Sequence, residues 1–241
     1  RYTGNWRASS TTHYRDYIGW LQRQDGNAAE TFWKGQLANL QQPTRLAQAV
    51  RLPVDGRPSG HAALHDIFDR EQTARIEAFA RTNRVTVNTL VQSAWMLLLQ
   101  RYTGQDTVCF GATVAGRPAD LPGVEEQIGL FINTLPVVGS PRSEQTVGQW
   151  INQVQANNLA MRELEHTPLY EIQRWAGAGG EALFDNILVF ENYPVSEALQ
   201  QGAPSGLRFG EVDNVEQTNY PLSVAVGLGN CLLYTSDAAD E

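Results

Sequence analysis

Histidine and acidic side chains are the first candidates for chemistry in this chain. His61 and His65 are four residues apart, and on a helix this spacing would place both imidazoles on one face, as in a zinc site. The run between them is typical of a strand, however, and no acidic third ligand follows it. We therefore predict structural or solvated histidines at these positions and no metal site.

A third histidine, His166, stands beside Glu163 and Glu165, just before a predicted helix start. A histidine in this setting can act as a catalytic base, or it can simply mark the entry to the helix. Helix entry is the commoner role. We therefore assign no catalytic residue within the chain.

The two cysteines, Cys109 and Cys231, form neither a CxxC motif nor a zinc-binding spacing. Cys109 lies in an apolar, strand-like run, which predicts a buried and unreactive thiol. The sequence also lacks a Walker loop, a GxGxxG motif and a GxSxG motif. Taken alone, these residues assign no reaction to the chain.

The charge balance argues against two classes of partner. The chain has 26 acidic residues against 18 lysines and arginines, a net charge of -8 at pH 7, so nucleic-acid phosphates would be repelled. No stretch approaches the roughly 18 consecutive apolar residues of a membrane span, and no N-terminal export signal is visible. We expect no nucleic-acid partner, no membrane association and a cytoplasmic location.

Hydrophobic periodicity predicts alternating helices and strands. Helices are predicted at residues 13–40 with a turn at 25–27, at 69–81, 87–102 and 146–163, and from 168 onward. Strands are predicted at 62–68, 107–114, 128–138, 183–191 and 221–228. Helix 87–102 is apolar on most of its circumference and should be buried. Residues 41–60 are predicted to be a linker. The alternation predicts an α/β fold, a layered mixed β-sheet with flanking helices.

Six blocks of sequence follow one another along the chain. They are residues 14–21 (YRDYIGWL), 88–95 (NTLVQSAW), 111–118 (GATVAGRP), 128–136 (IGLFINTLP), 166–171 (HTPLYE), and 183–185 (LFD) with 190–194 (FENYP). Together, and in this order, they resemble the condensation-domain family of nonribosomal peptide synthetases. The resemblance covers nearly the whole chain before residue 231.

The resemblance implies a chloramphenicol-acetyltransferase-like C-terminal subdomain, one of two halves that enclose a tunnel. In the family, carrier domains deliver thioesters on phosphopantetheine arms, and the acceptor amine attacks the donor thioester to form an amide. The implied partners are the N-terminal half of the domain, upstream and downstream carrier domains, and an adjacent adenylation domain. No cofactor is expected to bind the chain directly.

The family's His-His-x-x-x-Asp-Gly motif, which supplies the active-site histidine, is not in this sequence. We expect residues 1–230 to be the C-terminal half of a condensation domain that begins just beyond this motif. A positioned base contributes about 10²–10⁴ in rate, so we expect the chain to be inactive alone. Residues 231–241 (CLLYTSDAADE) resemble a translated sequencing adaptor, and we expect them not to be native.

By the same resemblance, four residues of the 128–136 block are the candidate tunnel-lining residues. Gly129 permits close backbone approach, while Asn133 and Thr134 are polar within an apolar run, where unpaired burial is costly. The set is Gly129, Phe131, Asn133 and Thr134. The competing interpretation is that the Asn133 amide only caps or cross-links local backbone. Arg117 is expected to form a salt bridge or to clamp backbone.

Several functional alternatives stay open. The 190–194 block disfavours an epimerisation domain, whereas heterocyclisation differs mainly in the absent motif. A freestanding acyltransferase of the same superfamily is a further interpretation. The last is a non-catalytic module that docks a carrier domain or recruits another enzyme.

Overall fold

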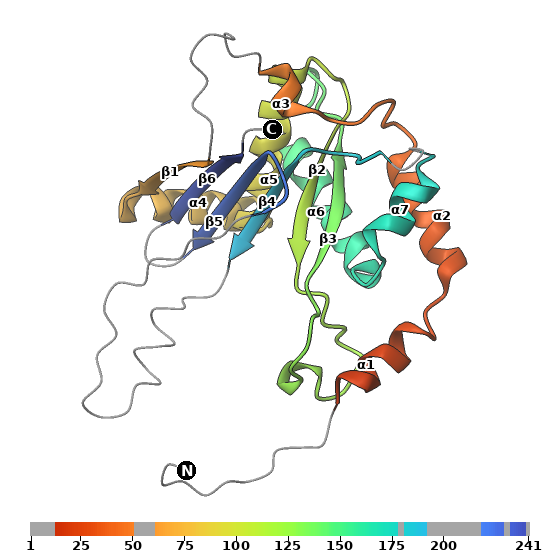
Figure 1. Cartoon of the computed structure of the whole chain (residues 1–241). Helices are drawn as coiled ribbons and strands as arrows, with labels where there is room; N and C mark the ends of the chain where they lie inside the picture. The colour runs from red at the N-terminus through yellow and green to blue at the C-terminus, as the bar shows by residue number, and fades with distance from the viewer. Residues whose placement is uncertain (1–12, 51–60, 178–180, 192–217, 229–231, 240–241) are drawn as a thin grey trace, which may run out of the picture.

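A computed structural model describes residues 13–50, 61–177, 181–191, 218–228 and 232–239 (Figure 1). Within these residues the strands form one six-stranded sheet in the order β1-β6-β5-β4-β2-β3. Strand β4 is parallel to β2 and β5, and the other neighbours are antiparallel. The strands are β1 (His61–Phe68), β2 (Val108–Val114), β3 (Asn133–Gly139), β4 (Asn186–Glu191), β5 (Leu222–Leu228) and β6 (Leu232–Ala239). The predicted mixed α/β fold is confirmed.

Helices flank this sheet, and short polar caps begin several of them. The Asp25 carboxylate accepts hydrogen bonds from the backbone N–H groups of Asn27 and Ala28, and Asp69 and Thr146 cap later helices in the same way. The helices are α1 (Tyr14–Leu21), α2 (Gly26–Leu37), α3 (Leu46–Ala49), α4 (Arg70–Asn83), α5 (Val87–Thr103), α6 (Val147–Met161) and α7 (Leu169–Trp175). Two 3-10 turns, η1 (Val124–Glu126) and η2 (Arg162–Leu164), complete the described elements.

Two predictions about these elements need correction, and one strand was missed. The strand predicted at 128–138 begins only at Asn133, because the residues before it belong to a loop that leaves the sheet. Helix α5 is not buried all round, since Leu97, Leu98 and Tyr102 are exposed on one face. Strand β6, which lies between β1 and β5, was not predicted, because residues 231–241 were expected not to be native.

The linker interpretation of residues 41–60 holds only in part. Residues 51–60 lie outside the described residues, but Thr44 is fully buried and forms a parallel bridge with Phe184. Its hydroxyl donates to Gln105 Oε1 at 2.9 Å and accepts from the Cys109 N–H at 2.8 Å. This part of the segment is therefore anchored to the sheet.

The main core lies between the sheet and the helices around it. Trp33 from α2, Met96 from α5 and Ile172 from α7 are fully buried together with Phe110 of β2. Cys109 is fully buried as well, and burial raises the pKa of its thiol above the usual range. The predicted burial of this thiol is confirmed.

Helices α5 and α6 meet through polar side chains as well as apolar ones. Gln155 Oε1 accepts hydrogen bonds from the Thr89 hydroxyl at 2.8 Å and from the Thr86 N–H at 2.9 Å. Asn158 Nδ2 donates to Gln92 Oε1 at 2.8 Å. Because these groups are directional, they fix how the two helices are rotated against one another.

A buried carboxylate joins α3 to the start of β4. Asp185 is 7% exposed, and its two oxygens each accept a backbone N–H at 2.9 Å, one from Leu46 and one from Ala47. The Asn186 amide donates to the same carboxylate at 3.1 Å, and its own oxygen accepts from the Trp95 indole at 3.0 Å. The network thus ties α3, β4 and α5 together.

Replacing Asp185 with Asn should lower the free energy of unfolding by about 2 kcal/mol. An asparagine places an NH₂ group against one of the two helix N–H donors, which then has no acceptor. Asp106→Asn makes the same chemical change at an exposed side chain and should stay within about 0.5 kcal/mol of the wild type. Urea unfolding measures both, and equal losses would contradict the assignment.

Candidate functional site

Loop 115–132, which joins β2 to β3, carries two of the four candidate residues, and an arginine holds it together. The Arg117 guanidinium donates to the carbonyl oxygen of Val124 and, from both terminal nitrogens, to that of Gln127 at 3.2 Å. Its carbon atom also lies 4.1 Å from the centroid of the Phe131 ring. The predicted backbone clamp at Arg117 is confirmed.

Phe131 is the inner anchor of this loop. It is 3% exposed and packs against α1 in a small second core formed with Tyr17, Trp20 and Val124. The Phe131 and Tyr17 ring centroids are 4.7 Å apart, and Tyr17 stacks on Trp20 at 6.0 Å. The aromatic residues of block 14–21 therefore hold the loop against α1.

Two glycines of the loop leave room for groups that a side chain would exclude, a tyrosine ring at one and a backbone carbonyl oxygen at the other. A Cβ atom on Gly129 would overlap the ring of Tyr14, whose hydroxyl donates to the Leu130 carbonyl at 2.7 Å. Gly116 has a φ of +61°, and a Cβ there would overlap the Phe131 carbonyl oxygen. The close approach at Gly129 is thus made by an aromatic ring and not by backbone as predicted.

The same loop turns three large apolar side chains outward. Ile128 is 95% exposed, Leu130 75% and Ile132 65%. We call these three residues the apolar ridge. Several large exposed apolar side chains on one short loop are more typical of an interaction surface than of a solvated loop.

Asn133, at the start of β3, binds a loop far away in the sequence. Its side-chain nitrogen donates to the carbonyl oxygens of Glu165 and Thr167, both at 2.8 Å, and its oxygen accepts the Thr134 N–H at 2.9 Å. The amide therefore cross-links backbone, but the carbonyl groups that it binds are distant in the sequence and not local as one interpretation expected. Thr134 is half-buried in β3, opposite Thr113 of β2.

The loop that Asn133 holds contains His166, which lies close to α1. Its ring meets the Trp20 ring edge-on, 5.0 Å between centroids, and the Trp20 indole donates to Asp120 Oδ2 at 3.0 Å. Burial lowers the pKa of His166, and the nearby Asp120 charge partly offsets this. Burial has the opposite effect on the carboxyl group of Glu165, whose pKa it raises. The Arg162 charge and a hydrogen bond from the Gly116 backbone N–H partly oppose this rise.

The other histidine candidates lie elsewhere. His61 and His65 are on β1, as the strand pattern predicted, and the His65 side chain is exposed. Within the described residues, no three His, Cys, Asp or Glu side chains come together as a metal site. No helix in that part of the chain is long and apolar enough to cross a membrane.

Comparison with known proteins assigns the chain to a protein family. The sequence model of the condensation domain matches residues 3–235. The chain belongs to the condensation-domain family. This agrees with the six sequence blocks, four of which carry residues of the site described above.

Similar curated proteins are large synthetases. A linear gramicidin synthase of Brevibacillus parabrevis is 46% identical over 224 residues, which are 91% of this chain and 3% of that protein. Chondramide synthase of Chondromyces crocatus is 41% identical over 220 residues, 91% of this chain and 6% of that protein. The condensation-domain chain thus spans a small fraction of the length of these relatives.

Solved structures show the same fold. The X-domain from teicoplanin biosynthesis has a TM-score of 0.72 at 22% identity, covering 97% of this chain and 55% of that one. The first condensation domain of the calcium-dependent antibiotic synthetase has a TM-score of 0.67 at 14% identity, covering 93% of this chain and 48% of that one. The chain therefore corresponds in fold to about half of each of these structures.

Of the four candidate residues, Gly129 and Phe131 hold the loop against α1, while Asn133 and Thr134 begin β3. Sequence reasoning missed the residues that complete the site. The Tyr14 hydroxyl donates to the Leu130 carbonyl, and the Asp120 carboxylate accepts from the Trp20 indole; both hydrogen bonds join residues far apart in the sequence. Only the clustering of aromatic residues in block 14–21 could have indicated such packing.

Asn133→Ala should lower the free energy of unfolding by about 2–3 kcal/mol, because two carbonyl groups lose their donor at once. Asn152→Ala is the matched control, since that exposed amide bonds only the Gly148 carbonyl of its own helix. The control should change stability by less than about 0.5 kcal/mol. Urea unfolding would contradict the cross-link if the two variants lost the same amount.

The His166 imidazole should titrate below its ordinary pKa of 6.5, as followed by the NMR signals of its ring protons. The folded state then disfavours the charged ring, so stability from this group is lost as the pH falls below 6.5. Asp120→Asn removes the favourable charge and should lower the pKa further, whereas Glu163→Gln should leave it in place. If the pKa of His166 rose in Asp120→Asn, the Asp120 charge would not be what raises it in the wild type.

Proposed function

We propose that this condensation domain takes part in amide-bond formation between thioester substrates delivered by carrier domains. In this role the chain supplies one half of the domain, and its loop 115–132 forms part of the wall facing the substrates. Phosphopantetheine arms on upstream and downstream carrier domains would bring the two substrates, with an adenylation domain nearby. The observation that carries the proposal is the condensation-domain match over residues 3–235.

The geometry of the loop supports a wall more than a reactive centre. The Arg117 clamp and the Phe131 anchor hold the backbone firmly, while the apolar ridge projects from it. Apolar side chains on a fixed backbone suit a surface that meets a second half-domain and excludes water. Gly129, Phe131, Asn133 and Thr134 would then act by shaping the wall and not by transferring protons.

We further propose that the chain needs a complementary half for turnover. The sequence contains no His-His-x-x-x-Asp-Gly motif, and the chain covers 48% and 55% of the two solved structures compared above. A positioned base and an enclosed site each contribute large factors in rate. The residues of loop 115–132 supply neither a positioned base nor an enclosed site.

A chimera tests this function directly. Residues 3–230 replace the matching segment in a condensation domain of the linear gramicidin synthase that is 46% identical to this chain. Given carrier-bound donor and acceptor, the chimera should form the amide product, detected by mass spectrometry, and the 241-residue chain alone should not. Asn133→Ala in the chimera should reduce the rate about 10- to 100-fold by displacing the wall.

The outcomes separate the alternatives. A folded chimera that binds the carriers but forms no amide would favour the docking or recruitment module. Turnover by the 241-residue chain alone would overturn the need for a complementary half. Product formation with free amines, without a carrier-bound acceptor, would favour a freestanding acyltransferase.

A further inference from the structure

One side chain of α1, that of Tyr14, meets three successive residues of loop 115–132 in three different ways. Its ring occupies the space that a Cβ atom on Gly129 would take. Its hydroxyl donates to the Leu130 carbonyl oxygen at 2.7 Å. Its ring also meets the Phe131 ring edge-on, with 5.3 Å between the centroids. This part of the loop is therefore placed by a single phenol.

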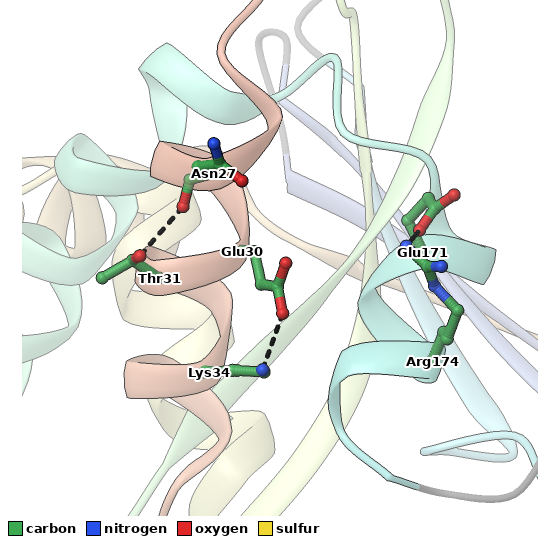
Figure 2. A network of polar contacts seen from close by, with 6 residues as sticks. All are labelled: Asn27, Glu30, Thr31, Lys34, Glu171 and Arg174. Atoms are coloured by element: carbon green, nitrogen blue, oxygen red, sulfur yellow. Dashed lines mark hydrogen bonds and ion pairs between the residues drawn. The ribbon is translucent and has the colours of Figure 1, made fainter.

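The contacts of Tyr14 differ in kind from the polar contacts of α2 and α7. In Figure 2, Glu30 pairs with Lys34 at 2.6 Å in α2, and Glu171 pairs with Arg174 in α7. Such pairs stabilise the helix that carries them. The hydrogen bond of the Tyr14 hydroxyl instead spans 116 positions of the sequence, so it fixes α1 and the loop relative to one another.

The hydroxyl acts at the centre of the apolar ridge. Leu130 stands between Ile128 and Ile132 in the ridge, and its side chain is 75% exposed. The Tyr14 hydroxyl binds the backbone of this middle residue and leaves its side chain exposed. The direction in which the ridge projects thus depends on the position of one carbonyl group.

The hydroxyl group should matter more for position than for stability. Its hydrogen bond lies in an exposed part of the structure, so water can replace it at the Leu130 carbonyl. The ring packs against the second core of Tyr17, Trp20, Val124 and Phe131, and a phenylalanine would keep that contact. What a phenylalanine loses is the angular preference of a hydrogen bond, which ring packing does not replace.

We propose that Tyr14 is a positioning residue for amide-bond formation, holding residues 129–131 and the apolar ridge in place in the wall that faces the substrates. This inference rests on the proposed function, because the ridge has a reaction to serve only if loop 115–132 forms that wall. Displacing a wall by a fraction of an ångström changes how the reacting groups are oriented, and so changes the rate.

The first test follows the hydrogen bond itself in the 241-residue chain, with ¹³C in the leucine carbonyl groups. Leu130→Val identifies the Leu130 signal by its loss. Tyr14→Phe, which removes only the hydroxyl, should shift that signal. Tyr102→Phe is the matched control, because it removes the hydroxyl of a tyrosine that is 60% exposed on α5, and it should leave the signal in place.

The second test uses the chimera with the gramicidin synthase domain. Tyr14→Phe should lower kcat about 3- to 10-fold, the effect of one hydrogen bond, and should leave KM for the carrier-bound substrates within about twofold. The urea midpoint of the chimera should stay within about 0.3 M of the parent. Tyr102→Phe should change none of the three quantities.

A double-mutant cycle reaches the same contact from the side of the loop. Gly129→Ala places a Cβ atom against the Tyr14 ring and should lower kcat about 10-fold. In Tyr14→Ala the ring is absent, so adding Gly129→Ala should cost less than about twofold more. Independent losses in the two variants would show that the ring and the glycine do not act together.

The outcomes separate the positioning role from the proposed function. If the parent chimera forms no amide, the proposed function fails, and the role of Tyr14 fails with it. If the parent is active and Tyr14→Phe is as fast as Tyr102→Phe, only the positioning role is overturned. An unchanged Leu130 signal in Tyr14→Phe overturns it too, as does a loss of rate that is matched by a large fall in the urea midpoint.

Discussion

The site depends on which donors the backbone carbonyl groups of loop 115–132 find away from the sheet. Between β2 and β3 the chain makes no strand pairs, so its carbonyl groups need other donors. Arg117 supplies them, binding the carbonyl oxygens of Val124 and Gln127 with one planar guanidinium. The face of the same group covers Phe131, and an arginine suits both tasks better than a lysine.

With the clamp in place, the alternation of buried and exposed residues in the loop follows. Phe131 turns inward to the aromatic residues of α1, and its neighbours Leu130 and Ile132 must then turn outward. Gly116 and Gly129 make room for a carbonyl group and a tyrosine ring that no larger residue would admit. The ridge is thus exposed because of the way its backbone is held, and its apolar character is a separate property of the sequence.

Local sequence signals predicted most of the elements but few of the contacts between them. The turn at residues 25–27 and the apolar periodicity of α5 located helices, because these signals involve residues close in the chain. The exposed face of α5 was missed, since burial depends on what packs there and not on composition. Strand β6 was missed because the adaptor-like residues were not expected to belong to the fold; their origin stays a prediction.

The candidate site shows the same division at the level of single residues. Asn133 and Gly129 could be singled out, because a polar residue and a glycine in an apolar run require an explanation. Their partners lie at positions 165, 167 and 14, and no spacing rule connects them. The Asn133 amide explains why the two regions must be considered together. A single side chain fixes the start of β3 and the entry to α7, so the end of loop 115–132 and the backbone at residues 165–167 rest on one set of hydrogen bonds.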